Sequence, residues 1–235
     1  MQRVRAIITA GLTSLCAGLA SLGMAQNVTV VELYTSQGCS SCPPADKLLH
    51  QLADRDDVIA LALHVDYWDY IGWKDEFADA RFTERQKGYA RAAGARSIYT
   101  PQMVIGGLDH VVGTKPNEVA AHLATHGAKS PLVNIEASRS GARLALTAEA
   151  AARNLGGVAV YVVTYRPVST VEIQRGENAG RTLDYANVVT SWTEAQPWNG
   201  VGRYDLSATV PEGEPAVVLF QRDGHGEIIG AVALR

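Results

Sequence analysis

The sequence predicts an α/β domain over residues 26–130, followed by an antiparallel all-β, sandwich-like domain over residues 131–235. The first prediction rests on continuous apolar runs, typical of strands, that alternate with segments in which apolar residues recur at helical spacing. The second rests on short apolar or alternating runs that are separated by turn residues, with no long amphipathic helix between them. A small polar stretch at residues 127–131 has the composition of a linker and indicates the boundary.

The first 25 residues have the pattern of an export signal. Arg3 and Arg5 precede a mostly apolar run to Leu22, and small residues follow where a signal peptidase requires them. The run is short for a membrane span and no basic cluster follows it, so we expect cleavage near Gln26 and no stable membrane span afterwards. The protein is therefore predicted to be periplasmic or secreted.

Composition and charge restrict the class of protein. The 235 residues are 47% hydrophobic with a formal net charge of -3, which is typical of a soluble globular protein. Loss of Arg3 and Arg5 makes the mature chain more negative, and no basic cluster occurs, so nucleic acid is not an expected partner. Because Cys16 lies in the predicted signal, the mature chain keeps only Cys39 and Cys42, and such a pair is better suited to reaction than to a structural framework.

The two cysteines lie between a predicted strand, residues 28–34, and a helical pattern at residues 45–53. At the start of a helix, the backbone N–H groups and the helix dipole stabilise a thiolate. We predict thiol–disulfide exchange without a further cofactor, with Cys39 as the exposed nucleophile and Cys42 as the resolving cysteine. Half of a four-thiolate zinc site, or a purely structural bridge, is the alternative. Neither a second Cys pair nor a His pair at ligand spacing is present, so no metal ligands are predicted for zinc.

The next apolar run, residues 58–65, predicts a buried strand parallel to the first. Loops at the carboxyl ends of parallel strands form the functional face of α/β sheets, so the aromatic residues that follow are candidates for a substrate groove. They are Tyr67, Trp68 and Trp73. Capping of the core by these rings is the alternative. Residues 74–93 then predict a helix.

Thr100 and Pro101 lead into a predicted hairpin. Its strands, residues 103–105 and 110–113, are joined through a Gly-Gly turn, and residues 116–126 predict a final helix of this half. A proline at the entry to such a strand is compatible with a cis peptide bond, which we predict here next to the cysteine pair.

These features together resemble the thioredoxin fold, and residues 100–113 are similar to the glutaredoxin branch. The resemblance implies that Pro101 is cis, packs against the CxxC and offers backbone groups to a bound peptide, and that Thr100 tunes the redox pair. It also implies that Glu32 matches the buried acid that takes the resolving thiol's proton, although its spacing to Cys39 is one residue longer.

The motif departs from thioredoxin in two respects. Ser40 and Ser41 replace Gly-Pro between the cysteines, and Gly38 stands where thioredoxins carry Trp, so redox potential and partner choice do not transfer. The whole chain resembles a family of exported bacterial thioredoxin-like proteins catalogued as a domain of unknown function. That resemblance is carried by residues 36–46, 64–73 and 99–106.

One loop of the second half is a further candidate. Within the polar loop at residues 175–182, residues 176–182 are faintly similar to a phosphate loop but lack the strand-then-helix context that a phosphate loop requires. If this loop folds over the CxxC, Asn178 and Arg181 meet the pair, and an Arg near a thiol favours the thiolate. We predict that this loop approaches the aromatic residues 67–73 and that Cys39 opens into a cleft between the two domains.

Three functional classes fit the sequence. The first is a periplasmic or secreted thiol–disulfide oxidoreductase that acts on exported proteins and exchanges electrons with a redox partner protein. The second is a copper or other metal-binding or delivery module, in which Cys39 and Cys42 hold Cu(I) and His64 or His110 completes the site. The third is a non-catalytic binding protein with the same fold. The Thr100-Pro101 loop favours the first class, while the direction of electron flow depends on a potential that the sequence does not set.

Overall fold

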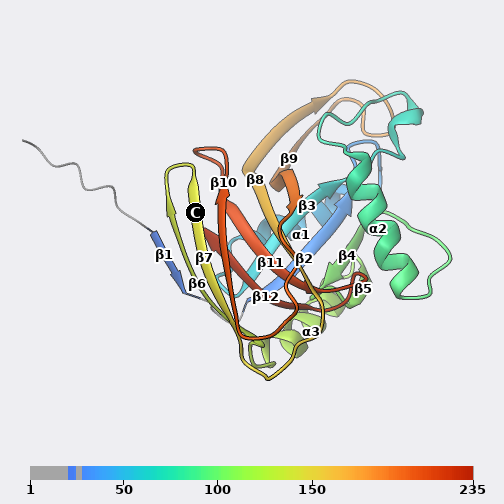
Figure 1. Ribbon diagram of the computed structural model, residues 1–235. Coiled ribbons are helices and arrows are strands. Elements are labelled where there is room, and N and C mark those ends of the chain that lie inside the picture. Colours follow the sequence, from blue (N-terminus) through green and yellow to red (C-terminus); the bar gives the residue numbers. More distant parts are fainter. Residues whose placement is uncertain (1–20, 25–27, 235) are drawn as a thin grey trace, which may run out of the picture.

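Two β-sheets and three α-helices organise the part of the chain that the computed structural model describes, residues 21–24 and 28–234 (Figure 1). The strands are β1 (Ser21–Met24), β2 (Thr29–Thr35), β3 (Val58–His64), β4 (Gln102–Ile105), β5 (Asp109–Val112), β6 (Val133–Ser140), β7 (Arg143–Ala150), β8 (Val158–Ile173), β9 (Arg181–Glu194), β10 (Arg203–Thr209), β11 (Ala216–Arg222) and β12 (Ile228–Leu234). The helices are α1 (Pro43–Ala53), α2 (Ala80–Ala92) and α3 (Pro116–Gly127), with a short 3-10 turn η1 (Asp69–Ile71). The larger sheet has the order β12-β11-β8-β9-β3-β2-β4-β5, and the smaller has the order β1-β6-β7-β10.

The predicted fold class, an α/β domain followed by a separate all-β domain, is wrong. β9 pairs antiparallel with β8 and also bridges β3 in parallel through Val188 and Ala62, so strands from both halves of the chain form one sheet. Polar, exposed residues such as Arg166, Thr170 and Glu172 in the outer part of β8, and Arg181 and Thr182 at the start of β9, weaken the strand signal in the sequence, although Val171, Ile173 and residues 185–189 are buried. The pairing of β9, rather than a linker, determines how the two halves associate.

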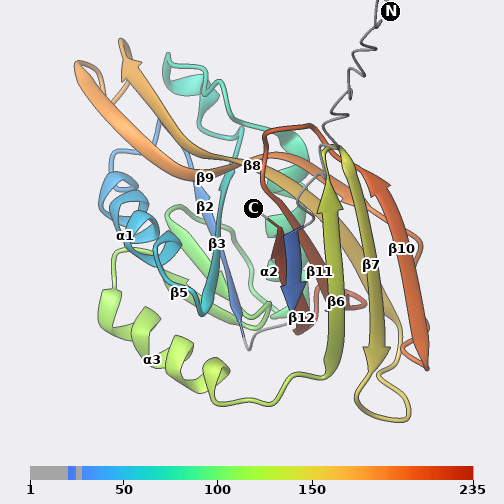
Figure 2. The ribbon, with the colours of Figure 1, turned by 90° about the vertical axis from the view of Figure 1, so that its left-hand side faces the viewer.

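The strands at the centre of the large sheet are covered on both faces. β2 and β3 are buried at every position. On one face, Val31 and Leu33 belong to the core that includes α1 and α3, and on the other face Val30 and Tyr34 belong to the core that includes α2. Figure 2 shows α1 and α3 on one side of these strands. Burial on both faces explains why both strands are read in the sequence as continuous apolar runs.

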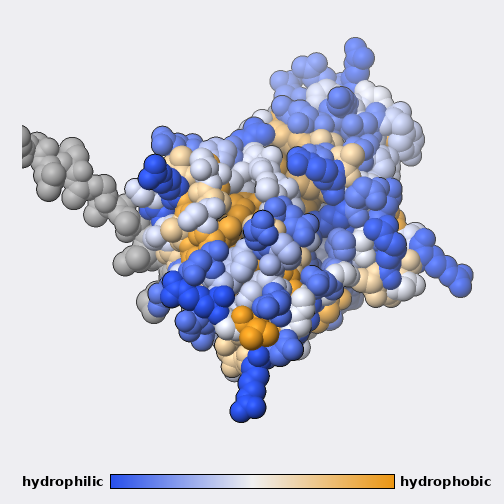
Figure 3. Space-filling model, viewed as in Figure 1, coloured by the Kyte–Doolittle hydropathy of each residue, from blue (hydrophilic) through white to orange (hydrophobic). Residues whose placement is uncertain are grey.

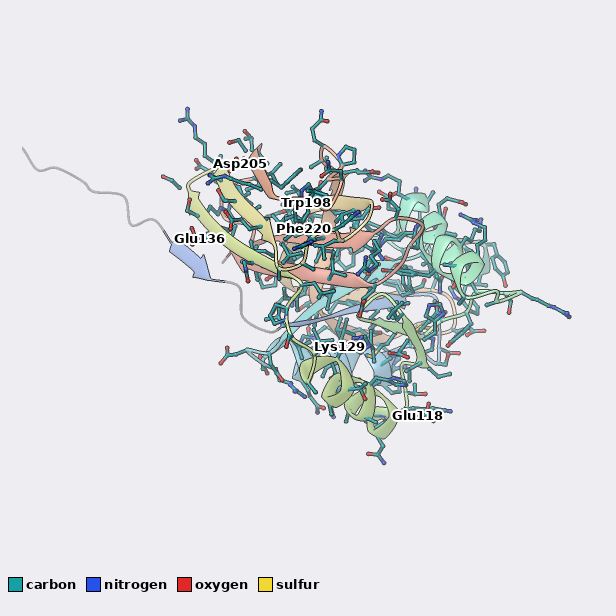
Figure 4. The ribbon with its side chains drawn as sticks, turned by 60° about the horizontal axis from the view of Figure 1, so that its bottom comes forward. Glu118, Lys129, Glu136, Trp198, Asp205 and Phe220 are labelled. Atoms are coloured by element: carbon teal, nitrogen blue, oxygen red, sulfur yellow. A yellow bond between two sulfur atoms is a disulfide. The ribbon has the colours of Figure 1, made fainter. Side chains whose placement is uncertain are left out.

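The four-stranded sheet packs on the section of the large sheet formed by β8, β11 and β12. Alternate residues of β6 and β7 are buried, and they share a core with Val160 and Val218. The rings of Trp198 and Phe220 lie in this core with centroids 5.9 Å apart (Figure 4). The second half of the chain therefore has the expected packing of sheet on sheet, but one of its two layers continues into the sheet of the first half.

The predicted export signal, residues 1–25, lies outside the described residues except for β1. The backbone of β1 pairs antiparallel with β6, from Ser21 opposite Arg139 to Met24 opposite Glu136. Cleavage near Gln26 would remove β1 and leave β6 at the edge of the smaller sheet. None of the described helices is long and apolar enough to cross a membrane. Polar residues cover most of the face in Figure 3, and hydrophobic residues gather beside the four-stranded sheet.

We expect the two halves of the chain to unfold together, because opening the large sheet at β9 exposes strands from both halves. Amide protons of β3 and β11 should then exchange with the same free energy of opening. Hydrogen exchange followed by mass spectrometry in increasing denaturant measures both values. A difference above about 2 kcal/mol between peptides that cover β3 and β11 would show independent units and contradict this expectation.

Candidate functional site

The cysteine pair lies between the end of β2 and the start of α1, in the predicted strand, turn and helix context. Cys39 and Cys42 form a disulfide with an S–S distance of 2.14 Å and a Cα–Cα distance of 5.4 Å. Cys42 is the N-cap residue of α1, and Pro43 and Pro44 follow in the first turn, where the missing N–H groups have no intrahelical partner to lose. We refer to residues 37–42 as the CxxC turn.

Both cysteines are buried, which corrects the prediction that Cys39 opens into a cleft. Their exposed fraction is 0%, whereas Ser40 and Ser41 between them are exposed. The Oγ of Ser41 lies 3.4 Å from the Sγ of Cys39. The disulfide therefore lies just beneath the surface, and neither sulfur is open to a reagent in this conformation.

The connection between β8 and β9 covers the CxxC turn. We call residues 174–180 the tip, and Asn178 is its buried residue, with an exposed fraction of 1%. The Nδ2 of Asn178 donates to the carbonyl oxygens of Gln37, at 2.9 Å, and Cys39, at 3.0 Å. Arg181, which is exposed, donates from Nη1 to the Oδ1 of Asn178 at 2.9 Å. The loop thus lies over the cysteine pair as the sequence analysis considered, and Arg181 reaches the turn through Asn178.

The aromatic loop, residues 67–73, forms a second wall beside the CxxC turn. The Nε1 of Trp73 donates to the Oε1 of Gln37 at 2.7 Å. A Cβ atom added to Gly176 in the tip would lie 3.2 Å from the Cβ of Trp73, so the two loops meet as predicted. Figures 1 and 2 both show the end of the β8–β9 hairpin next to this loop.

The close approach of the aromatic loop also explains the glycine that precedes Cys39. A Cβ atom at Gly38 would lie 3.1 Å from the Cδ1 of Ile71 and 3.2 Å from the Cβ of Trp68. Tyr67 has a different environment, because its hydroxyl donates to the Oε1 of Gln86 on α2 at 3.1 Å. Of the three aromatic residues singled out in the sequence, Trp68 and Trp73 border the CxxC turn and Tyr67 packs toward the core.

The Thr100-Pro101 peptide bond is cis, as predicted. The Nε1 of Trp68 donates to the Oγ1 of Thr100 at 2.7 Å, which joins this loop to the aromatic loop. A Cβ atom at Gly113 would lie 2.8 Å from the Cβ of Ala45 and 3.3 Å from the Cβ of Pro101. The loop therefore lies beside the first turn of α1, the turn that follows Cys42 directly.

The structure gives Glu32 a role different from the one implied by the resemblance. Its carboxylate accepts hydrogen bonds from Arg85 through Nε, at 2.7 Å, and Nη2, at 2.9 Å, and from the hydroxyls of Tyr34 and Tyr89. This network lies on the face of the sheet that α2 covers, opposite α1. Glu32 therefore holds the charge of Arg85 in the core and is not available to the cysteine pair.

The buried carboxyl group near the cysteine pair belongs to Asp46. Its N–H donates to the carbonyl oxygen of Cys42 at 3.1 Å, and residues four apart share a face of a helix. The Oδ1 of Asp46 accepts a hydrogen bond from Thr35 at 2.8 Å, while Oδ2 is buried without a hydrogen-bond partner in the described part of the chain. Burial raises the pKa of Asp46 to about 7, against the opposing effects of His64 and of the Thr35 hydroxyl. Asp46 can therefore exchange a proton near neutral pH.

A buried histidine and aspartate complete the polar cluster. The Nδ1 of His64 lies 2.7 Å from the Oδ2 of Asp75, and that oxygen also accepts the N–H of Gln37 at 2.8 Å. Burial disfavours the charged imidazole, but the Asp75 carboxylate outweighs it and raises the pKa of His64. The same pairing lowers the pKa of Asp75, although burial alone raises it. The Tyr185 ring lies 4.9 Å from that of His64, and the Nε2 of His64 and the hydroxyl of Tyr185 are buried with no hydrogen-bond partner within residues 21–24 and 28–234.

Asp46 and Asp75 are not among the site residues that the sequence predicts. The available signal for Asp46 was its spacing, four residues after Cys42 in a predicted helix, whereas only the tertiary structure brings Asp75 to the CxxC turn. Across the described ranges, no three His, Cys, Asp or Glu side chains are grouped so that they could hold a metal ion. Of the histidines considered for copper, His64 pairs with Asp75, and the ring of His110 packs 5.9 Å from that of Tyr89.

A family model described as "Protein of unknown function (DUF1223)" matches residues 30–221. The chain belongs to this family. No curated protein gives a match. Among solved structures, the crystal structure of a protein from Agrobacterium tumefaciens, determined as a structural genomics target, is similar with a TM-score of 0.74 and 32% sequence identity, over 89% of this chain and 96% of that chain. The predicted relationship to a family of unknown function is confirmed.

Asp46→Asn should change the pH dependence of stability of this DUF1223 protein. The folded-state pKa of Asp46, about 7, lies above the ordinary value of 3.8, so native stability is lost as the pH rises from about 4 to about 7. At about 1.4 kcal/mol per pH unit, the free energy of unfolding of the variant relative to the wild type should increase by about 3 kcal/mol between pH 5 and pH 8. Denaturant unfolding at both values measures this, with the exposed Asp54→Asn on the same segment as control. A constant difference between the variant and the wild type would contradict it.

Glu32→Gln should destabilise the DUF1223 protein without altering the disulfide. Removal of the carboxylate leaves the buried Arg85 without its counter-charge, which typically costs about 3–5 kcal/mol. Denaturant unfolding measures the loss, and the rate of disulfide reduction in the folded variant serves as the second measurement. A reduction rate changed more than a few-fold would connect Glu32 to the cysteine pair after all.

Proposed function

We propose that this protein is a thiol–disulfide oxidoreductase of the thioredoxin-like superfamily that acts on cysteines of exported proteins, in the periplasm or outside the cell. The observation that carries the proposal is the disulfide at the N-terminus of α1 beside Asp46, a buried carboxyl group whose pKa is near neutral. Buried groups with strongly shifted pKa values next to a reactive pair are typical of functional sites. A purely structural disulfide has no use for a neighbouring group that exchanges a proton near neutral pH.

The arrangement of the first half supports membership of the superfamily. β2 is parallel to β3, β4 is antiparallel to β2, and β5 is antiparallel to β4. Helices α1 and α3 cover one face of these strands and α2 covers the other. This is the order of elements that the resemblance to thioredoxin implies, here as one section of a wider sheet that β9 extends beyond β3.

The proposed reaction takes place in two displacement steps. A substrate thiolate attacks the Sγ of Cys39, the disulfide bond breaks, and the electron pair leaves on the Sγ of Cys42, which takes a proton from Asp46. A second substrate thiolate attacks the substrate sulfur of the mixed disulfide and releases the thiolate of Cys39, which the N-terminus of α1 stabilises. The substrate loses two electrons and the pair gains them. A redox partner protein reverses the change, and the same steps in reverse reduce substrate disulfides.

The buried histidine pair helps Asp46 in this reaction. After Asp46 gives up its proton, the positive charge of His64 stabilises the carboxylate that remains. Asp75 in turn keeps His64 charged and accepts the N–H of Gln37, so it connects the charge of the cluster with the backbone of the CxxC turn. The two redox states of the pair thus differ in proton content close to Asp46, the group of this cluster whose pKa is about 7.

Cys42→Ser should trap mixed disulfides between Cys39 and exported proteins, because the resolving thiol is missing. Capture from a periplasmic extract, followed by elution with a reductant and mass spectrometry, identifies the partners. Cys39→Ser is the matched control and should trap far fewer, since the proposed roles make Cys39 the attacked sulfur and Cys42, the N-cap residue of α1, the resolving one. Equal trapping by the two variants would reverse the assigned roles, and no trapping by either would exclude the oxidoreductase function.

A further inference from the structure

We propose that Asn178 is a latch that holds the tip of the β8–β9 hairpin over the disulfide, and that an extended polypeptide segment of the substrate displaces it. The inference rests on the proposed function and assigns the substrate class of the same site. It makes Asn178 a positioning residue that controls access to Cys39.

The burial of the cysteine pair requires that some element moves before exchange. A thiolate must reach the Sγ of Cys39, whose residue has an exposed fraction of 0%. The aromatic loop is held on several sides, because Trp68 binds Thr100, Trp73 binds Gln37, and both rings pack on core residues. The first turn of α1 is fixed by its helix. The tip is therefore the element best able to move.

The tip is anchored to the CxxC turn through one side chain. Asn178 is buried, whereas the other residues of the segment 174–180 are exposed. The backbone hydrogen bonds of the tip are local, from Gly180 to Ile173 at 2.7 Å and from Ala179 to Gly176 at 3.2 Å. These bonds keep the tip folded as a unit while it moves. Arg181 donates to the Oδ1 of Asn178 and so orients the Nδ2 group toward the CxxC turn.

The chemistry of the latch indicates what replaces it. Asn178 supplies one amide group to two backbone carbonyl oxygens, those of Gln37 and Cys39, and buried carbonyl groups left without a donor are unfavourable. An extended peptide carries one N–H group about every 3.3 Å and can replace these donors. A small reductant without N–H groups cannot. Displacement of the tip therefore favours a polypeptide thiol over a small one.

The surface around the tip is shaped for such a segment. A groove of about 550 Å³ runs between α1 and the start of β9, directly beside the position of Arg181. Its lining combines the proline pair of α1 with polar and charged side chains: Pro43, Pro44, Asp46, Lys47, His50, Arg181, Thr182, Leu183 and Asp184. On the side of the aromatic loop, the Tyr70 side chain is 81% exposed. A peptide that takes the place of Asn178 therefore has contact surface in the groove that begins at Pro43, next to Cys42, and at Arg181, the partner of Asn178.

The test compares the wild type with Asn178→Ala, Asn178→Asp and the exposed neighbour Glu177→Ala. The rate of reduction of the Cys39–Cys42 disulfide is measured by alkylation and mass spectrometry with two probes, tris(2-carboxyethyl)phosphine and a short unstructured peptide that carries two cysteines. Asn178→Ala should raise the phosphine rate about tenfold, equivalent to about 1.4 kcal/mol. Asn178→Asp should raise it at least as much, because a carboxylate would face two carbonyl oxygens. Glu177→Ala should stay within about twofold of the wild type, a change of less than 0.5 kcal/mol by the same conversion.

The peptide rate should rise less than the phosphine rate in both Asn178 variants. In the wild type the N–H groups of the peptide already replace the amide of Asn178 when the tip is displaced, so removal of that amide helps the peptide less than the phosphine. Near-UV circular dichroism of each variant verifies the fold. Phosphine rates that are unchanged or lower in both folded Asn178 variants would overturn the latch, and equal gains for phosphine and peptide would overturn the assigned substrate class. The phosphine arm does not depend on catalysis, so a failure of the proposed function would appear separately, as the absence of trapped partners with Cys42→Ser.

Discussion

The pairing of β9 with β3 is the constraint on which the arrangement of the site depends. β9 reaches β3 at Val188, and the neighbouring Asn187 donates from Nδ2 to the carbonyl oxygen of Ala60 at 2.8 Å with a left-handed backbone, φ 47°. This places the β8–β9 hairpin alongside α1, so its tip ends over the disulfide. Without that pairing, the βαβ unit would present an open CxxC turn, and the second half of the chain would have no means of acting on it.

The two faces of the large sheet divide structural and chemical roles. On the α2 face, Arg85 is buried with Glu32 and lies 4.0 Å from the ring centroid of Trp192 on β9, and it also donates to Gln221 on β11. Because Glu32 lies on β2, one charged group connects strands from both halves of the chain. The α1 face carries the cysteine pair and Asp46. Both faces bury ionisable groups, but only the α1 face leaves polar atoms of such groups without partners in the described residues, which suits the proton transfer proposed for Asp46.

In the proposed mechanism, access to the pair and the protonation of its surroundings are controlled from different elements. Asn178 in the tip donates to the carbonyl oxygens of Gln37 and Cys39 in the CxxC turn. Asp75, which follows the aromatic loop, accepts the N–H of Gln37. Gln37 thus contacts the tip through its carbonyl oxygen, and it contacts the aromatic loop and Asp75 through its side chain and its N–H group. A movement of the tip therefore alters the same backbone segment that the polar cluster holds, which gives the site a direct physical connection between opening and chemistry.

The local pattern of the sequence determined the cysteine pair and most of the elements around it. Continuous apolar runs specified β2 and β3, helical spacing specified α1, and the CxxC between them specified the disulfide, because each of these signals comes from neighbouring residues. The tertiary structure decided the rest. β9 has polar outer residues and gains its strand conformation from pairing, so the shared sheet and the burial of Cys39 could not be predicted. Likewise, Glu32 and Asp46 are both acids near the pair in sequence, and only the face of the sheet to which each points decides which one can serve it.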